Sequence, residues 1–341
     1  MERFSYHRAE GVDQAVAMQA RSNTAQQGAT VRFLAGGTTL VDLMKLNVEQ
    51  PETLVDLRAL GLEGIEVATD GALSIGASVK NAALAQNADV KSRYTMLSQA
   101  LLSGASPQLR NKATTAGNLL QRTRCMYFRD TAMSCNKRVP GSGCAARTGM
   151  HRHLAILGTS EHCIASNPSD MNVALMALDA VVHIQGTQGK RAVPIDAFFR
   201  LPGDTPHVET VLVPGDLITH VTLPSPAPDA VSVYLKLRDR ASYEFALTSA
   251  AVEIVMDGDK VAHARIALGG VGAKPWRAKR AEHALVGQLA SKANFIAAAQ
   301  AEMTQAQPLA QNRFKVELAT RCLARALSQA QASSLSAKDA S

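Results

Sequence analysis

The chain has 341 residues, 46% hydrophobic and 19% charged, which is typical of a soluble protein large enough for two or three domains. Lys and Arg exceed Asp and Glu by 36 − 29 = 7, a modestly basic balance. The excess gathers beside cysteines rather than with exposed aromatics, which argues against nucleic-acid binding. These cations are Arg122, Arg124, Arg129, Lys137, Arg138, Arg147 and Arg152. No stretch approaches the roughly 20 apolar residues of a membrane span, so we expect none.

The first residues, MERFSYHRAEGVDQAVAM, contain no apolar segment of the signal-peptide type. We therefore expect the chain to carry no export signal of its own. Two compartments stay open on this ground. The chain remains in the cytoplasm, or it is exported with a partner that carries a signal.

The N-terminal third reads as short strands and helices joined by glycine turns. In chain order we predict a helix at 11–21, strands at 31–35, 53–57 and 73–77, a helix starting near Thr38, and a helix within 95–121. Ser78 is expected to cap the helix after the third strand. Residues 122–164 are rich in Arg, Gly and Ser and lack periodicity, so we interpret them as an irregular insertion.

Regular structure resumes beyond the insertion. We predict a helix at 171–180, a strand at 180–185, a proline-rich linker at 224–228, strands at 231–238, 246–256 and 261–268, and helices near 278–304 and 312–329. Asp257-Gly258 predicts a hairpin turn. The polar tail is expected to be disordered. This order of elements predicts an α+β fold with a boundary near residue 226.

Four of the five cysteines lie between Cys125 and Cys163, with the spacing C-x9-C-x8-C-x18-C. The spacing contains no CxxC pair of the kind that zinc sites favour. A [4Fe–4S] cluster needs four thiolates and tolerates wide spacing, and nearby cations would offset its negative charge. Zinc and disulfides remain open on spacing alone. Cys322 lies at helical spacing with apolar residues and is expected to be a buried core thiol.

Two glycine-containing turns resemble anion-binding loops. Gly36-Gly37 lies between a predicted strand and a helix start, where backbone amides can approach a phosphate closely. Neither GxGxxG nor GxxxxGK[ST] is present, so no nucleotide hydrolysis is indicated. Thr114-Thr115-Ala116-Gly117-Asn118 is a similar turn. A tight structural turn is the alternative for each, and it is the preferred interpretation of Gly269-Gly270-Val271-Gly272.

Five segments, taken in order, resemble a known family: FLAGGTTLVDLMK, LSIGASV, SPQLRNKATTAGNL, NPSDMNVALMALDA and KLRDRASYEFALTSAAV. They are similar to the FAD-binding subunits of the xanthine dehydrogenase and aldehyde oxidase family of molybdenum hydroxylases. The segment RCMYFRDTAMSCNKRVPGSGCAA is similar to the [4Fe–4S]-containing flavin subunits of bacterial periplasmic aldehyde oxidoreductases. That similarity favours the periplasm, reached by export with a partner.

The resemblance implies a two-lobed FAD-binding domain of the PCMH type and a C-terminal α+β domain of the CO dehydrogenase flavoprotein type. The implied domains are lobe 1 at 1–58, lobe 2 at 59–224 with the iron–sulfur insertion 122–164, the C-terminal domain at 228–330, and a disordered tail at 331–341. FAD is expected between the two lobes, with the C-terminal domain closing over it.

The resemblance also assigns residues. The pyrophosphate loop corresponds to Ala35, Gly36, Gly37, Thr38, Thr39 and Leu40, and the second flavin loop to Thr114, Thr115, Gly117 and Asn118. Asp170 corresponds to a contact with the ribose or adenine end, and Lys236 to a basic residue near the isoalloxazine. Cys125, Cys135, Cys144 and Cys163 correspond to the cluster ligands. Ala116 replaces a glycine found in many relatives, and its methyl group fits if φ there is negative.

The implied function is electron transfer, with no catalytic residue on this chain. A large partner subunit with a molybdenum cofactor would oxidise an aldehyde, and a small subunit with two [2Fe–2S] clusters would relay electrons. FAD would pass them to an external acceptor such as ferredoxin. The alternative is the flavin subunit of another molybdenum hydroxylase, of the xanthine, N-heterocycle or hydroxybenzoyl-CoA type. A zinc-containing binding protein without flavin is the rival from another class.

Overall fold

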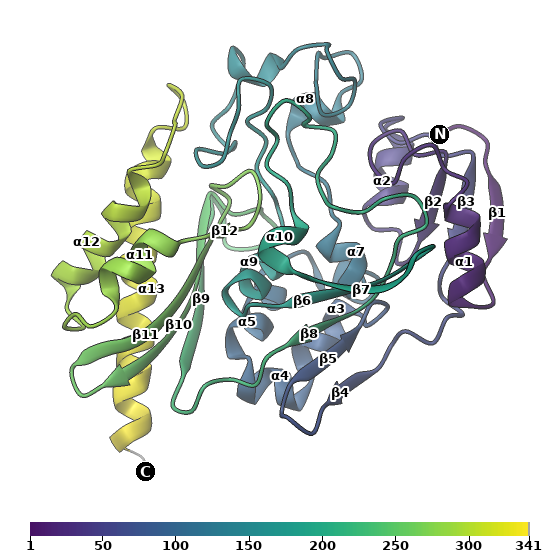
Figure 1. Ribbon diagram of the computed structural model, residues 1–341. Coiled ribbons are helices and arrows are strands. Elements are labelled where there is room, and N and C mark those ends of the chain that lie inside the picture. The colour runs from purple at the N-terminus through teal and green to yellow at the C-terminus, as the bar shows by residue number, and fades with distance from the viewer. Residues whose placement is uncertain (340–341) are drawn as a thin grey trace.

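The computed structural model describes the backbone of residues 1–339 and the side chains of residues 1–335. Its strands form three separate sheets, which follow one another along the chain (Figure 1). The first sheet is parallel, with strand order β1-β3-β2. Its elements are β1 (Ser5–Arg8), α1 (Val12–Gln19), β2 (Val31–Leu34), α2 (Leu40–Lys45) and β3 (Thr53–Asp56). The helices lie within the crossovers that parallel strands require.

The second sheet is antiparallel, with the order β4-β5-β8-β6-β7. Its strands are β4 (Ile65–Val67), β5 (Leu73–Gly76), β6 (Val181–Gly186), β7 (Gly189–Pro194) and β8 (Leu217–Leu223). The helices beside it are α3 (Asn81–Gln86), α4 (Ala88–Arg93), α5 (Thr95–Ser103), α6 (Pro107–Arg110), α7 (Thr115–Leu119), α9 (Asp170–Ala177) and α10 (Ile195–Phe198). Every residue of α9 is buried, because this helix packs between α5 and the C-terminal strands β10 and β11.

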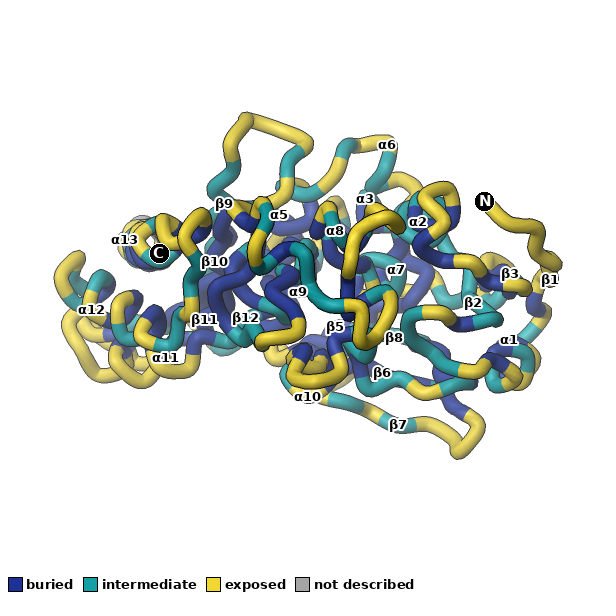
Figure 2. Tube along the Cα trace, turned by 90° about the horizontal axis from the view of Figure 1, so that it is seen from above, coloured by how far each residue is buried: buried dark blue, intermediate teal, exposed yellow. Residues whose placement is uncertain are grey.

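The third sheet is antiparallel, with the order β12-β11-β10-β9. It contains β9 (Val231–Leu237), β10 (Thr248–Asp257), β11 (Lys260–Gly269) and β12 (Trp276–Arg277). Three helices cover one face, namely α11 (Lys279–Leu285), α12 (Lys292–Met303) and α13 (Phe314–Asp339), at the left of Figure 1. The first seven residues of β10 are buried because α13 covers one face and α9 the other. Figure 2 shows this buried centre between exposed margins.

Residues 122–164 project from the second lobe as an irregular segment, at the top of Figure 1. Their only helices are α8 (Met126–Arg129) and the 3-10 turn Ala145–Arg147. A small apolar cluster lies inside the segment, and Phe128, Ala146 and three of the cysteines belong to it. The expectation of an insertion without regular structure is therefore confirmed.

The α+β class is confirmed, and so is the hairpin turn at Asp257-Gly258. Four local expectations are wrong. Ser78 caps no helix, since α3 begins at Asn81 and the Ser78 amide donates to the Leu62 carbonyl. The single helix expected in 95–121 is three helices, and the helix expected at 278–304 is interrupted near Gly287.

The fourth wrong expectation concerns the C-terminal tail. Residues 331–339 continue helix α13 rather than being disordered. The remaining two residues of the predicted tail, 340–341, lie outside the described part. Within residues 1–339, no helix combines the length and apolarity needed to cross a membrane.

Candidate functional site

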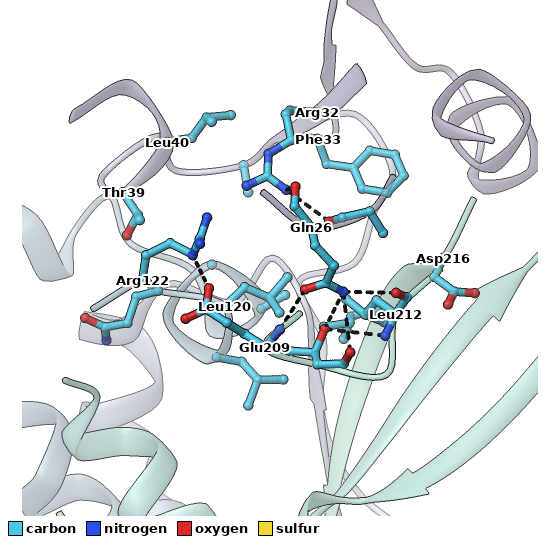
Figure 3. A pocket seen from close by; sticks show the side chains of 18 of the residues that line it. Gln26, Arg32, Phe33, Thr39, Leu40, Leu120, Arg122, Glu209, Leu212 and Asp216 are labelled. Atoms are coloured by element: carbon cyan, nitrogen blue, oxygen red, sulfur yellow. Dashed lines mark hydrogen bonds and ion pairs between the residues drawn. The ribbon is translucent and has the colours of Figure 1, made fainter. Parts of the chain in front are cut away.

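A cavity of about 210 Å³ lies between the first and second lobes, and we call it the first cavity (Figure 3). The predicted pyrophosphate loop forms one wall, since all six residues from Ala35 to Leu40 line the cavity. Thr114 and Gly117 also line this cavity. The structure therefore brings together two glycine-containing turns that are far apart in the sequence.

The two glycines of the first loop are required by geometry. A Cβ on Gly36 would overlap the backbone carbonyl of Lys112, whose carbon would lie only 2.8 Å away. Gly37 has φ +75, a conformation that L-residues rarely adopt. Thr39 precedes α2 as its N-cap, yet its hydroxyl makes no capping hydrogen bond. The loop is therefore held close to the Lys112 backbone while its hydroxyls face the cavity.

The second turn opens helix α7. The Thr114 hydroxyl accepts a hydrogen bond from the Gly117 amide at 3.2 Å. Ala116 lies inside α7 and has no positive φ, so its methyl group is tolerated as expected. Thr115 lines neither the first cavity nor the adjoining second cavity described next, because it is fully buried and its hydroxyl donates to the Val79 carbonyl. Its expected role beside the flavin therefore has no side-chain contact to support it.

A second cavity, of about 580 Å³, adjoins the first and shares Thr38, Thr39 and Gly117 with it. Asn118, Asp170 and Lys236 line this second cavity. The Asn118 side chain accepts a hydrogen bond from the Ser169 hydroxyl at 2.8 Å, which joins the second turn to the start of α9. All the predicted flavin-loop residues except Thr115 thus line one of two connected cavities.

Asp170 and Lys236 form a buried ion pair. The Lys236 ammonium lies 2.8 Å from Asp170 Oδ2, and the two side chains are 4% and 8% exposed. Tyr234 donates to the other carboxylate oxygen at 2.5 Å. Burial raises the pKa of the Tyr234 hydroxyl well above its usual range, and the Asp170 charge raises it further. Tyr234 therefore stays a hydrogen-bond donor.

The ion pair joins two residues that were expected to have different roles. Asp170 was expected at the ribose or adenine end of FAD and Lys236 at the isoalloxazine, whereas their side chains are in direct contact. Which part of FAD each residue faces stays a prediction. The contact itself was not predicted, because the residues lie on α9 and β9, far apart in the chain.

The four clustered cysteines line a single small cavity inside the insertion, which we call the cysteine cavity. Cys125, Cys135 and Cys163 are buried, whereas Cys144 is partly exposed. The Ala165 backbone amide donates a hydrogen bond to the Cys163 sulfur at 3.5 Å.

All four thiols are free. Burial raises the pKa of the Cys125 thiol to about 12 and also raises the pKa values of Cys144 and Cys163. Among the described side chains, no group of three or more His, Cys, Asp and Glu closes on a position for a single metal ion. The fifth cysteine, Cys322, is buried in the core beneath the third sheet, as expected.

A row of alternating charges, which sequence reasoning missed, lies beside the first cavity. Arg32 and Arg122 both contact Glu49, at 3.0 and 2.6 Å. Arg122 also contacts Glu209, and Lys137 lies 2.9 Å from Glu209. Burial alone would raise the pKa of Glu209, but the charges of Arg122 and Lys137 hold it below its usual range. Figure 3 shows Arg32, Arg122 and Glu209 around the cavity.

Comparisons with known proteins agree with this architecture. Residues 2–226 match the family described as the FAD binding domain in molybdopterin dehydrogenase, and residues 233–330 match the CO dehydrogenase flavoprotein C-terminal domain. The fold and the paired loops are thus those of a flavoprotein oxidoreductase subunit. The chain belongs to the FAD-binding subunits of the molybdenum hydroxylases, as its motifs predicted.

Two relatives illustrate the range of similarity. The aldehyde oxidoreductase FAD-binding subunit PaoB of Escherichia coli K12 is 51% identical over 310 residues, which cover 91% of this chain and 94% of the relative. The carbon monoxide dehydrogenase medium chain of Hydrogenophaga pseudoflava is 27% identical over 96% of this chain and 97% of its own length. A solved structure of that organism's carbon monoxide dehydrogenase superposes with a TM-score of 0.75, at 27% identity, over 97% of this chain and 98% of the other.

Proposed function

We propose that this chain is the FAD and [4Fe–4S] electron-transfer subunit of a molybdenum-dependent aldehyde oxidoreductase. Electrons would arrive from [2Fe–2S] clusters on a small partner subunit and leave to an external one-electron acceptor such as ferredoxin. The molybdenum cofactor would lie on a large partner subunit, and export with that partner would bring the chain to the periplasm. The observation that carries the proposal is the position of the cysteine cavity beside the first cavity, since Lys137, Cys163 and Ala165 line both.

The residues around the first two cavities fit FAD. Gly36 lets the loop pack against the Lys112 backbone and Gly37 allows its left-handed turn. Thr38 and Thr39 of the same loop line the first cavity, where their hydroxyls can donate to a pyrophosphate. The Asp170–Lys236 pair offers a fixed carboxylate and ammonium beside the second turn. When bound, FAD would collect two electrons, arriving one at a time from the [2Fe–2S] clusters, and could release them singly. The protein orients the cofactor and supplies its electrostatic surroundings.

The cysteine cavity fits a cubane cluster by its donor set. Four thiols converge on one cavity, and the Ala165 amide, which donates to the Cys163 sulfur at 3.5 Å, is the kind of donor that stabilises a thiolate-bound cluster. When bound, the cluster supplies one-electron exchange. Cys144 is the most exposed of the four, so we expect its side of the insertion to face an external acceptor.

The proposal is tested on the complex, purified without oxygen. We expect flavin absorption near 450 nm with a broad iron–sulfur shoulder, as these chromophores absorb. Acid-labile sulfide should fall in Cys135→Ser and stay at the wild-type level in Cys322→Ser. Zinc in place of iron would contradict the cluster assignment. Unchanged ferredoxin reduction by a folded, cluster-free Cys135→Ser complex would contradict the electron-exit role.

The substrate class rests on the 51% identity to a relative named as an aldehyde oxidoreductase subunit. The substrate pocket belongs to the large subunit, so the matched experiment is a substrate panel on the intact complex. Aldehyde-dependent reduction of the flavin supports the proposal. Reduction by a purine, an N-heterocycle or an aromatic thioester, with none by aldehydes, would replace it with another molybdenum hydroxylase.

A further inference from the structure

The row of charges beside the first cavity ends at the cysteine cavity. It runs Arg32, Glu49, Arg122, Glu209 and Lys137, with contacts of 3.0, 2.6 and 2.9 Å at three of its steps. Its members come from lobe 1, from the insertion and from the segment before β8. Glu49, Arg122 and Lys137 are buried, so water screens this row less than it screens surface pairs.

Lys137 lies in the wall that the first cavity and the cysteine cavity share. It is 7% exposed, and its ammonium donates to Glu209 at 2.9 Å and to the Pro206 carbonyl at 2.9 Å. Among the described residues that line the cysteine cavity, it is the only Lys or Arg. Cys163 lines the same shared wall, since it too borders both the first cavity and the cysteine cavity.

We propose that Lys137 sets the reduction potential of the cluster held by the four cysteines, and that Glu209 moderates its effect. This inference rests on the cluster assigned under the proposed function. A fixed cation close to a cluster stabilises the added electron, whereas a fixed anion destabilises it. Lys137 and Glu209 would therefore adjust the cluster potential in opposite directions.

The two partners provide a matched pair of variants. Lys137→Gln and Glu209→Gln break the same contact and replace a charge with an amide of similar size. A purely structural role predicts shifts of the same sign from both variants, or none. The electrostatic role predicts a lower potential in Lys137→Gln and a higher one in Glu209→Gln. In each case we expect about a tenfold change in the one-electron equilibrium, which is about 59 mV.

The measurement is a reductive titration of the intact complex with dithionite as electron donor, followed by the EPR signal of the singly reduced cluster. Arg152→Gln is the control, because it removes an insertion cation that does not line the cysteine cavity and whose carboxylate partner, Asp239, is 43% exposed to solvent. We expect its potential to match the wild type. Lys137→Arg keeps the charge and should retain most of the wild-type potential, which gives a second test if Glu209→Gln does not fold.

Equal potentials in Lys137→Gln and the wild type would overturn the inference, and so would shifts of the same sign in Lys137→Gln and Glu209→Gln. An equal decrease of the cluster reduction potential in Lys137→Arg and Lys137→Gln would also overturn the inference. Failure of the proposed function looks different. In that case the wild-type complex itself would lack the cubane EPR signal and the corresponding labile sulfide.

Discussion

Replacing Gly36 with alanine tests whether the first loop cradles the cofactor. The added Cβ would lie 2.8 Å from the carbonyl carbon of Lys112, whereas ordinary contacts begin at 3.4 Å. The Lys112 carbonyl oxygen would lie closer still, so the loop and the Lys112 backbone must separate by more than 3.4 − 2.8 = 0.6 Å. Because both partners in this contact are backbone, no side chain can rotate away.

Overpacking of this kind costs about 1–3 kcal/mol. The free chain can relieve the strain by moving the loop outward, but FAD binding requires the loop in place. We therefore expect FAD affinity to fall by about fivefold to about 150-fold. Flavin fluorescence titration of the deflavinated complex measures this directly.

Gly11→Ala is the matched control for this substitution. A Cβ there meets nothing within 4 Å, and the backbone lies outside the left-handed region. We expect its FAD affinity to equal that of the wild type. Wild-type affinity in Gly36→Ala, with the variant folded, would refute the assignment of this loop to the cofactor.

Three further substitutions probe the charges around the site. Asp170→Asn leaves the Lys236 ammonium buried without its anion, so we expect the free energy of unfolding to fall by about 3–5 kcal/mol. A fall of less than about 1 kcal/mol would contradict the buried ion pair. Burial lowers the pKa of Lys315 to about 7 from 10.5, so wild-type stability should rise from pH 7 to 10.5, and Lys315→Met should abolish that rise in denaturant titrations. Burial raises the pKa of Asp56, but hydrogen bonds from Arg58 and Tyr6 outweigh this and hold it at about 2. The stability that the Asp56 carboxylate contributes is thus present above pH 3.8 and lost as the pH falls toward 2. Asp56→Asn should therefore lower the free energy of unfolding by about 1 kcal/mol at pH 7 and leave it unchanged near pH 2. The same loss at both pH values would contradict this linkage.

Local signals were sufficient for much of the fold and for the loops of the site. Gly36-Gly37 lies between an apolar strand and a helix, as predicted. This turn could be predicted because strand, turn and helix preferences act between residues close in the sequence. Strand β10 is largely apolar from Ala250 to Met256, apart from Glu253, and it is covered on both faces. The convergence of four thiols was expected from their uneven distribution and from the resemblance.

The remaining features depend on contacts that local patterns do not encode. Strand β1 was missed because all four of its residues are exposed, which leaves no apolar alternation. The Asp170–Lys236 pair and the contact between Arg122 and Glu49 join residues 66 and 73 positions apart. The helical tail was missed because its polar composition resembles that of a disordered segment, although it continues the buried helix α13.

The central claim is that this subunit holds a cubane cluster beside its flavin. The most direct test is the EPR spectrum of the fully reduced complex, compared between the wild type and Cys163→Ser, with iron and flavin measured on the same samples. We predict that the variant loses the cubane signal and its iron while keeping flavin and both [2Fe–2S] signals. Identical spectra and identical iron contents in the two complexes would contradict the account.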